Sequence, residues 1–260
     1  MRLVLVVILA ISLLSNYLFA STVPKKNFIT IAYAQNWKPY SYKDKNAKMQ
    51  GILVEIVDKL LRDKLKMRVD HVGLPWKRAQ KSVSTGLMDA LITVPTIDRL
   101  KYSQSTTNDL YNLKWRIFVS KRSKKFSKIM SMKDPLDSEK FTYISLLGDK
   151  TSENLYKQKN KKYSLVKNIN NAIKMLAIGR ADIFIHSQMV MTENLNNLKL
   201  DDDVKMHPKE YVKIPFTLLI SKKSKYRDSL TKKVDEIVND MKKNNEYKSL
   251  IKEIENSNVN

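Results

Sequence analysis

The stretch AQKSVSTGLMDALITV (residues 79–94) has a near copy further along the chain, AIKMLAIGRADIFIHS (residues 172–187). Each reads as the end of a helix, then Gly-x-x-Asp, then an apolar strand. The glycine supplies the positive backbone angle that ends a helix, and the aspartate accepts amide hydrogen bonds in a tight turn. We therefore predict structural roles for Asp89 and Asp182. The repeat predicts two lobes that share one alternating α/β plan with parallel strands.

The rest of the chain fits the same plan, because apolar alternation and helical spacing follow one another along it. Within each unit we expect a right-handed crossover. A helix that begins in TSENLYKQK would take Thr151 or Ser152 as its cap. The predicted strands are residues 27–33, 67–74, 90–94, 141–147, 163–168, 183–186 and 214–224. The predicted helices are residues 52–65, 75–86, 151–159, 169–178, 226–243 and 246–254.

The N-terminus has the features of a secretory signal peptide. Arg2 precedes an apolar run over residues 3–14, and small residues follow at Ala20 and Ser21. We predict a signal peptide over residues 1–20 and a periplasmic mature protein; the alternative is an uncleaved membrane anchor. With 0 cysteines, the chain has neither a lipid-modified cysteine nor a disulfide.

The charge of the chain is strongly positive, at a formal net +22. The excess is mostly lysine and is spread over the whole length, in pieces such as KRSKKFSK (residues 121–128). No groove-reading motif or aromatic-basic platform accompanies it, so we do not predict nucleic-acid binding. A mild preference for anionic ligands is compatible with this charge.

A family resemblance rests on five segments in a fixed order: NWKPYSYKDKNAKMQGILVEIVDKLL, LPWKRAQKSVSTGLMDALITV, IDR, AIGRADIFIHS and IPFTLLISKKS. In this order they resemble the bacterial solute-binding proteins of the amino-acid-binding type, class two of the periplasmic binding fold. The Pro-Trp-x-Arg-Ala element resembles a divergent branch.

The resemblance implies a two-lobed α/β fold that closes around a ligand in the cleft between the lobes. One lobe would comprise residues 25–114 plus 212–260, and the other residues 115–211. Two hinge strands would join them near residues 113–117 and 209–213.

The resemblance also implies ligand contacts in the first lobe. The family's carboxylate-clamping arginine corresponds to Arg99, whose planar guanidinium suits a carboxylate. The alternative for Arg99 is an ordinary surface position. The connection from Asp89 to Arg99 is two residues shorter than the family usually has, which affects the neighbouring donors Thr93 and Thr96. The aromatic residue that packs on the ligand corresponds to Tyr40.

Other first-lobe candidates are less direct. Trp37 lies near Tyr40 in a loop with few aliphatic residues, which favours cleft lining over a core position. Trp76 is either core or cleft lining. Arg78, two residues further on, faces differently and is a candidate second anion contact.

In the second lobe, the resemblance places ligand donors at the start of the helix after YISLLG, which gives Thr151 and Ser152. The main departure is Ser187, where amino-acid binders commonly carry an aspartate that pairs with the ligand's ammonium group. His186 is a candidate ligand contact beside it. Without the aspartate, an ordinary α-amino acid is a doubtful ligand.

Three functions follow from these observations. The leading one is a periplasmic, monomeric protein that captures a small carboxylate-bearing solute for an ABC-type transporter. The second is an enzyme on the same fold, resembling the cyclohexadienyl dehydratases, with Glu55 or Glu153 as its general acid. The third is a sensory or accessory binding module. The histidines lack metal-ligand spacing and no phosphate loop is present, so we predict no metal and no cofactor.

Overall fold

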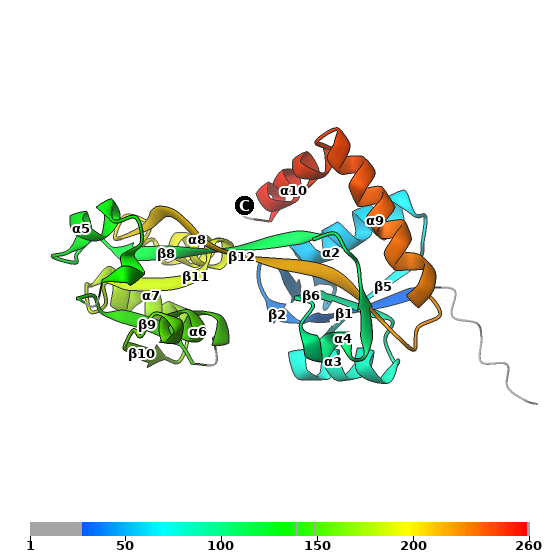
Figure 1. Cartoon of the computed structure of the whole chain (residues 1–260), viewed down its shortest axis with the longest axis horizontal. Helices are drawn as coiled ribbons and strands as arrows, with labels where there is room; N and C mark the ends of the chain where they lie inside the picture. The colour runs from blue at the N-terminus through cyan, green and yellow to red at the C-terminus, as the bar shows by residue number, and fades with distance from the viewer. Residues whose placement is uncertain (1–27, 139, 148, 259–260) are drawn as a thin grey trace, which may run out of the picture.

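The computed structural model describes residues 28–138, 140–147 and 149–258, without the side chains of residues 150 and 151. The predicted signal peptide therefore lies outside the described residues. Two groups of elements lie at opposite ends of two long strands, β8 (Tyr111–Ser120) and β12 (Val204–Ser221) (Figure 1). We call these groups the first and the second lobe. The two-lobed α/β fold expected from the sequence is confirmed.

The first lobe contains β1 (Ile29–Ala34), β2 (Asn36–Trp37), β3 (Ser41–Lys43), β4 (Met49–Gln50), α2 (Ile52–Val57), the π-helical η1 (Asp58–Lys64), β5 (Val69–Leu74), α3 (Trp76–Thr85), β6 (Ala90–Thr93), α4 (Ile97–Leu100), β7 (Ser103–Ser105), α9 (Arg227–Lys243) and α10 (Glu246–Ser257). The second lobe contains α5 (Phe126–Ser131), the 3₁₀ turn η2 (Pro135–Asp137), β9 (Tyr143–Leu146), α6 (Lys150–Gln158), β10 (Tyr163–Val166), α7 (Ile169–Ala177), β11 (Ile183–Ser187) and α8 (Gln188–Leu198).

The two lobes repeat one strand order. The continuous path is β10-β9-β11-β8-β12-β6-β1-β5, with β8 and β12 paired at its centre. In the first lobe, β1 pairs in parallel with β5 and β6, and β6 pairs antiparallel with β12. In the second lobe, β9 pairs in parallel with β10 and β11, and β11 pairs antiparallel with β8. The repeated Gly-x-x-Asp motif in the sequence therefore corresponds to a strand arrangement that is repeated in the two lobes.

Side-chain alternation along the strands builds a core on both faces of the first-lobe sheet. Ile29 and Ile31 of β1 pack into the large cluster that includes the apolar face of α2. Ala32, on the opposite face, packs with Ala79 and Val83 of α3. Figure 1 shows α3 on one side of this sheet and α2 and α9 on the other. The helices thus cover both faces, as a parallel sheet requires.

The same corner joins helix to strand in both lobes. The Asp89 carboxylate accepts hydrogen bonds from Thr30 N, Thr30 Oγ1 and Ser224 Oγ, at 2.9, 2.9 and 2.8 Å. Asp182 accepts from the amide and hydroxyl of Thr142, at 2.8 and 3.0 Å, and from the hydroxyl of Ser123. The amides come from the neighbouring strand and not from the turn itself, which corrects the geometry expected from the sequence.

The glycines of the two Gly-x-x-Asp motifs are needed for the same turn from helix to strand. Gly86 and Gly179 have φ values of 81° and 77°, in the left-handed region. A Cβ added to Gly86 would lie 2.8 Å from Lys223 Cβ, and one added to Gly179 would lie 3.4 Å from Arg122 Cβ. Lys223 and Arg122 each precede the serine that donates to the aspartate, in SKKSK and SKRSK. The second duplicated motif, SKKSK in one lobe and SKRSK in the other, therefore packs against the Gly-x-x-Asp motif of its lobe.

Some local expectations from the sequence are wrong. Helix α6 begins at Lys150, so Thr151 and Ser152 lie inside it, and Asp149 Oδ1 accepts the Ser152 amide at 3.3 Å as the cap. Helix α8 and the full length of β12 are not among the predicted elements.

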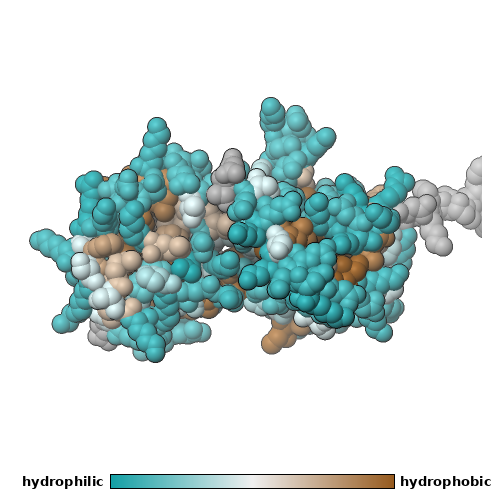
Figure 2. Space-filling view, turned by 90° about the horizontal axis from the view of Figure 1, so that it is seen from above, coloured by the Kyte–Doolittle hydropathy of each residue, from teal (hydrophilic) through white to brown (hydrophobic). Residues whose placement is uncertain are grey.

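The outer surface is mainly hydrophilic, in agreement with the high proportion of charged residues in the sequence. Figure 2 shows hydrophilic side chains over most of the viewed face, with apolar side chains in separate patches. Among the described residues, no helix has both the length and the apolar composition to cross a membrane.

We predict that Asp89→Ala and Asp182→Ala each lower the free energy of unfolding by about 2–3 kcal/mol, because each removes a buried carboxylate that accepts several hydrogen bonds, one of them from a backbone amide. Urea denaturation followed by circular dichroism measures this. Asp240→Ala is the control, because that carboxylate is exposed and pairs with the exposed Lys243. Equal stability of Asp89→Ala and Asp240→Ala would contradict the role given to the corner.

Candidate functional site

A hollow of the first lobe lies where the parallel strands β1 and β6 end, next to the start of α3. Ligands of open α/β sheets bind at this edge. We call it the first-lobe pocket; its volume is about 680 Å³. Its lining residues are Tyr33, Ala34, Trp37, Ser41, Leu53, Trp76, Ile92, Thr93, Val94, Thr96, Arg99, Ile214 and Phe216.

One charged side chain, Arg99, lines this pocket. Its Nη1 donates to Val94 O at 2.9 Å and its Nε donates to Gln80 Oε1 at 3.1 Å. The guanidinium carbon lies 5.3 Å from the centre of the Trp76 ring. Partial burial lowers the pKa of Arg99 from its ordinary value, yet an arginine remains charged at neutral pH. The guanidinium is therefore held in place while Nη2 bonds to no described residue.

Aromatic rings form the opposite part of the site. The ring centroid of Trp37 lies 4.6 Å from that of Tyr40 and 5.7 Å from that of Phe216. Tyr40 is fully buried, and Tyr111 lies behind it at 5.8 Å. Trp37 is thus supported by packed rings and presents an apolar wall. A fixed cation beside aromatic walls suits a small molecule with one anionic group.

The residues predicted from the sequence fall into two sets. Trp37, Trp76, Thr93, Thr96 and Arg99 line the first-lobe pocket together. The Thr96 hydroxyl also accepts the Arg99 amide at 3.4 Å, as the cap of α4. The second set does not line this pocket.

Tyr40 and Ser187 meet each other across the lobes, with 2.6 Å between their hydroxyl oxygens. Ser187 also caps α8 by accepting the Val190 amide at 3.5 Å. A second contact between the lobes lies close by in sequence, where Lys38 Nζ is 2.9 Å from Glu193 Oε1. The loop that holds Tyr40 therefore connects the lobes.

The remaining predicted residues lie elsewhere. Arg78 is exposed on α3. Ser152 is buried inside the second lobe, where its hydroxyl lies 2.6 Å from that of Ser145 and 2.7 Å from Asp149 Oδ2. Thr151 belongs to α6, and its side chain is outside the described part of the structure.

His186 packs within the second lobe, between two rings. Its ring centroid lies 5.1 Å from that of Trp115 and 5.3 Å from that of Phe184. Its Nδ1 is buried and has no hydrogen-bond partner among the described residues. Burial lowers the pKa of His186 from 6.5 to about 4, so the ring is neutral at pH 7. It contributes no positive charge to the site at that pH.

Several pocket residues were not among the sequence candidates. Ile214 and Phe216 come from β12, far along the chain from the other lining residues, and only the fold brings them there. Tyr33 is the last residue but one of β1, and its place near the end of a parallel strand is a signal that the sequence offers. Metal binding has no support among the described residues, since no group of three His, Asp or Glu side chains could hold an ion.

Comparisons with known proteins agree with this architecture. A family model described as bacterial extracellular solute-binding proteins, family 3, matches residues 29–254. The probable amino-acid-binding protein YxeM of Bacillus subtilis is 23% identical over 225 residues, which cover 85% of this chain and 81% of that protein.

Solved structures show the same fold. An ancestral amino-acid-binding protein, described as a precursor of cyclohexadienyl dehydratase, is 22% identical with a TM-score of 0.62, covering 88% of this chain and 95% of that one. A histidine kinase sensor domain with similarity to periplasmic binding proteins is 16% identical with a TM-score of 0.63, covering 86% and 93%.

His186 yields a prediction on pH. The stability that its neutral form contributes is present above pH 6.5 and is lost as the pH falls toward 4, because the unfolded chain takes up the proton first. We expect His186→Phe to remove about 2–3 kcal/mol of this acid destabilisation. Urea denaturation of both proteins at several pH values between 7 and 4 measures it. Parallel stability curves for the two proteins would contradict the burial of a neutral ring.

Proposed function

The chain belongs to family 3 of the bacterial extracellular solute-binding proteins, and on that premise we propose that it captures a small carboxylate-bearing solute in the periplasm for an ABC-type transporter. The observation that carries this proposal is Arg99. Its guanidinium is fixed by Val94 O, Gln80 and the Trp76 ring while two donors on Nη2 stay available to a ligand. A carboxylate accepts charge-assisted hydrogen bonds from such donors.

The pocket lacks a partner for a positively charged group. None of the residues that line it is an aspartate or a glutamate. At position 187 the resemblance expects the aspartate that binds the ammonium group. Here the Ser187 hydroxyl instead hydrogen-bonds the Tyr40 hydroxyl and accepts the Val190 amide as the cap of α8. We therefore propose that the preferred ligand is a carboxylate-bearing solute other than an ordinary zwitterionic α-amino acid.

We propose lobes of residues 25–114 plus 212–260 and of residues 115–211, with closure about the two connecting strands. Support comes from the strand pairing: β12 joins the first lobe through Thr217–Ile220, while β8 joins the second lobe through Trp115–Val119. Between these contacts the two strands pair mainly with each other. We further propose export by a signal peptide over residues 1–20 and a monomer that docks a transporter permease.

An enzyme on the same fold is the alternative. One structural neighbour is described as a precursor of cyclohexadienyl dehydratase. The two sequence candidates for a general acid do not line the pocket: Glu55 accepts a hydrogen bond from Asn258 Nδ2 at 2.7 Å, and Glu153 is buried in α6. This arrangement favours binding over turnover. A sensory or accessory module remains the third function, supported by likeness to the kinase sensor domain.

We predict that a screen of the mature protein against amino acids, monocarboxylates, dicarboxylates and polyamines raises the melting temperature most with a carboxylate that bears no ammonium group, because ligand binding stabilises the folded state. Arg99→Ala should weaken binding of that compound by about tenfold to a hundredfold, as expected for a lost charge-assisted pair. Isothermal titration calorimetry measures the affinity.

Arg68→Ala is the matched control, because Arg68 is exposed and lines none of the pockets described for this chain. The control should bind like the parent. If Arg99→Ala and the parent bind the same carboxylate equally well, the clamp assignment is wrong. If a polyamine or a zwitterionic amino acid is the tightest ligand, the proposed ligand class is wrong.

The enzyme alternative has its own test. We expect incubation with prephenate or arogenate to give no product, because no carboxylic acid lines the pocket to protonate a leaving hydroxyl. Absorbance of the aromatic product measures turnover. If the parent protein forms product and Glu55→Gln or Glu153→Gln does not, the proposed binding function is wrong and catalysis replaces it.

A further inference from the structure

The lining of the first-lobe pocket is mainly apolar. Of its thirteen residues, nine have apolar or aromatic side chains, and four of these nine carry an aromatic ring. The volume of about 680 Å³ is in the range of pockets that bury most of a small organic ligand. A carboxylate bound to Arg99 uses only one part of this space. The rest of the ligand therefore meets apolar surface.

Trp37 offers a ring surface to that part of the ligand. Its indole is partly exposed and lines the pocket, while the two rings packed against it, those of Tyr40 and Phe216, are buried. Aromatic rings attract one another in offset or edge-to-face arrangements, beyond the effect of the area that they bury. Trp37 is thus a supported aromatic surface that a planar ring can cover.

Three of the four hydroxyl groups of the lining already bind other groups of the protein, namely those of Tyr33, Ser41 and Thr96. The Tyr33 hydroxyl lies 3.0 Å from His71 Nδ1, and His71 Nε2 lies 2.9 Å from Asp58 Oδ1. Since the Asp58 carboxylate accepts from Nε2, Nδ1 of the neutral ring accepts from Tyr33. A ligand rich in hydroxyl groups would therefore find few partners in this pocket.

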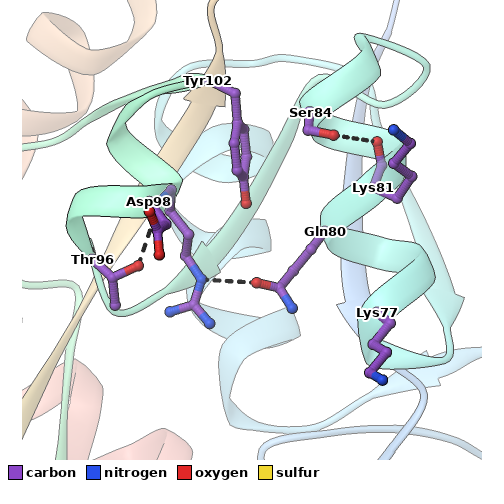
Figure 3. A pocket seen from close by; sticks show the side chains of 8 residues that line it. Lys77, Gln80, Lys81, Ser84, Thr96, Asp98 and Tyr102 are labelled. Atoms are coloured by element: carbon purple, nitrogen blue, oxygen red, sulfur yellow. Dashed lines mark hydrogen bonds between the residues drawn. The ribbon is translucent and has the colours of Figure 1, made fainter.

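The pocket also lacks a second cation. Lys77 and Lys81 of α3 are exposed and do not line it. Figure 3 shows both ammonium groups pointing away from the guanidinium that donates to Gln80. A second carboxylate on the ligand would lose its water without gaining a positive partner. Monocarboxylates therefore suit the pocket better than dicarboxylates.

We propose that the ligand of the first-lobe pocket is an aryl monocarboxylate, in which a short linker joins one carboxylate to an aromatic ring and no ammonium group is present. This inference rests on the proposed function and narrows its ligand class. Arg99, stacked on Trp76, binds the carboxylate, and Trp37 packs against the ring. Trp37 is then the residue that determines specificity for the ring.

Two matched series of acids test the ring by isothermal titration calorimetry of the mature protein. Phenylacetate, 3-phenylpropanoate and 4-phenylbutanoate are compared with acetate, propanoate and butanoate, so that only the ring differs within a pair while the linker length varies. We expect the tightest aryl acid to bind about a hundredfold more tightly than its alkanoate, as the apolar area of one buried ring implies. L-phenylalanine differs from 3-phenylpropanoate only by the ammonium group and should bind about tenfold more weakly.

The Trp37→Leu variant tests the aromatic surface. It should bind the tightest aryl acid about threefold to tenfold more weakly than the parent, which is the contribution of an aromatic pair. Phe126→Leu is the matched control, because that ring is partly exposed on α5 of the second lobe and does not line the pocket. The control should bind like the parent.

Equal affinities within every pair of aryl acid and alkanoate would overturn the ring preference, and so would tighter binding of succinate than of any aryl acid. Trp37→Leu that binds like the parent, or that loses no more affinity than Phe126→Leu, would overturn the role of Trp37. In each of these cases the proposed function stands as long as Arg99→Ala weakens binding of the preferred carboxylate. If no carboxylate binds, or if Arg99→Ala binds the aryl acids as tightly as the parent, the proposed function fails together with this inference.

Discussion

The hydrogen bonds of one aspartate in each lobe determine where the strand edges of this protein lie. Asp89 binds both the amide and the hydroxyl of Thr30 in β1, and Asp182 binds the same two groups of Thr142, which directly precedes β9. The amide of each aspartate donates back to that threonine hydroxyl at 3.0 Å. This exchange fixes the start of β6 against β1 and the start of β11 against β9. Burial alone would raise the pKa of Asp182, but hydrogen bonds from Ser123, Thr142 and Lys125 hold it below the usual value. The Asp182 carboxylate therefore stays ionised and hydrogen-bonded. Because these bonds fix where each strand starts, they also fix where its opposite end lies.

The two lobes are covalently continuous through β8 and β12, but they also touch at a loop. The Tyr40 hydroxyl bonds that of Ser187, and Lys38 pairs with Glu193, so the segment that supports Trp37 is attached to the N-cap and the middle of α8. A rotation of one lobe against the other must change these contacts or carry the loop with it. The position of one pocket wall is consequently coupled to the relative position of the lobes.

The fold was largely predictable, because helix and strand periods and the repeated Gly-x-x-Asp phrase are local signals. The site was predictable only in part. Arg99 and Trp37 follow strand ends, which is a local signal, and both line the first-lobe pocket. Phe216 reaches the pocket from β12 by strand pairing, which no local pattern reveals. The sequence predicts Ser152 to be a free donor at a helix start, yet it packs inward because the helix begins earlier and Asp149 is its cap. Side-chain direction at a helix end depends on that single-residue difference.

The electrostatic character of the first-lobe pocket follows from which charges the fold leaves unpaired. Most lysines are exposed and surrounded by water, so their net excess acts weakly at the pocket. Arg99 differs, because partial burial and neutral partners leave its charge uncompensated at short range. His186 is neutral at pH 7, and Glu193 is engaged with Lys38, so neither balances that charge. This unpaired charge supports the proposed ligand class, a solute with a negative group and no positive one.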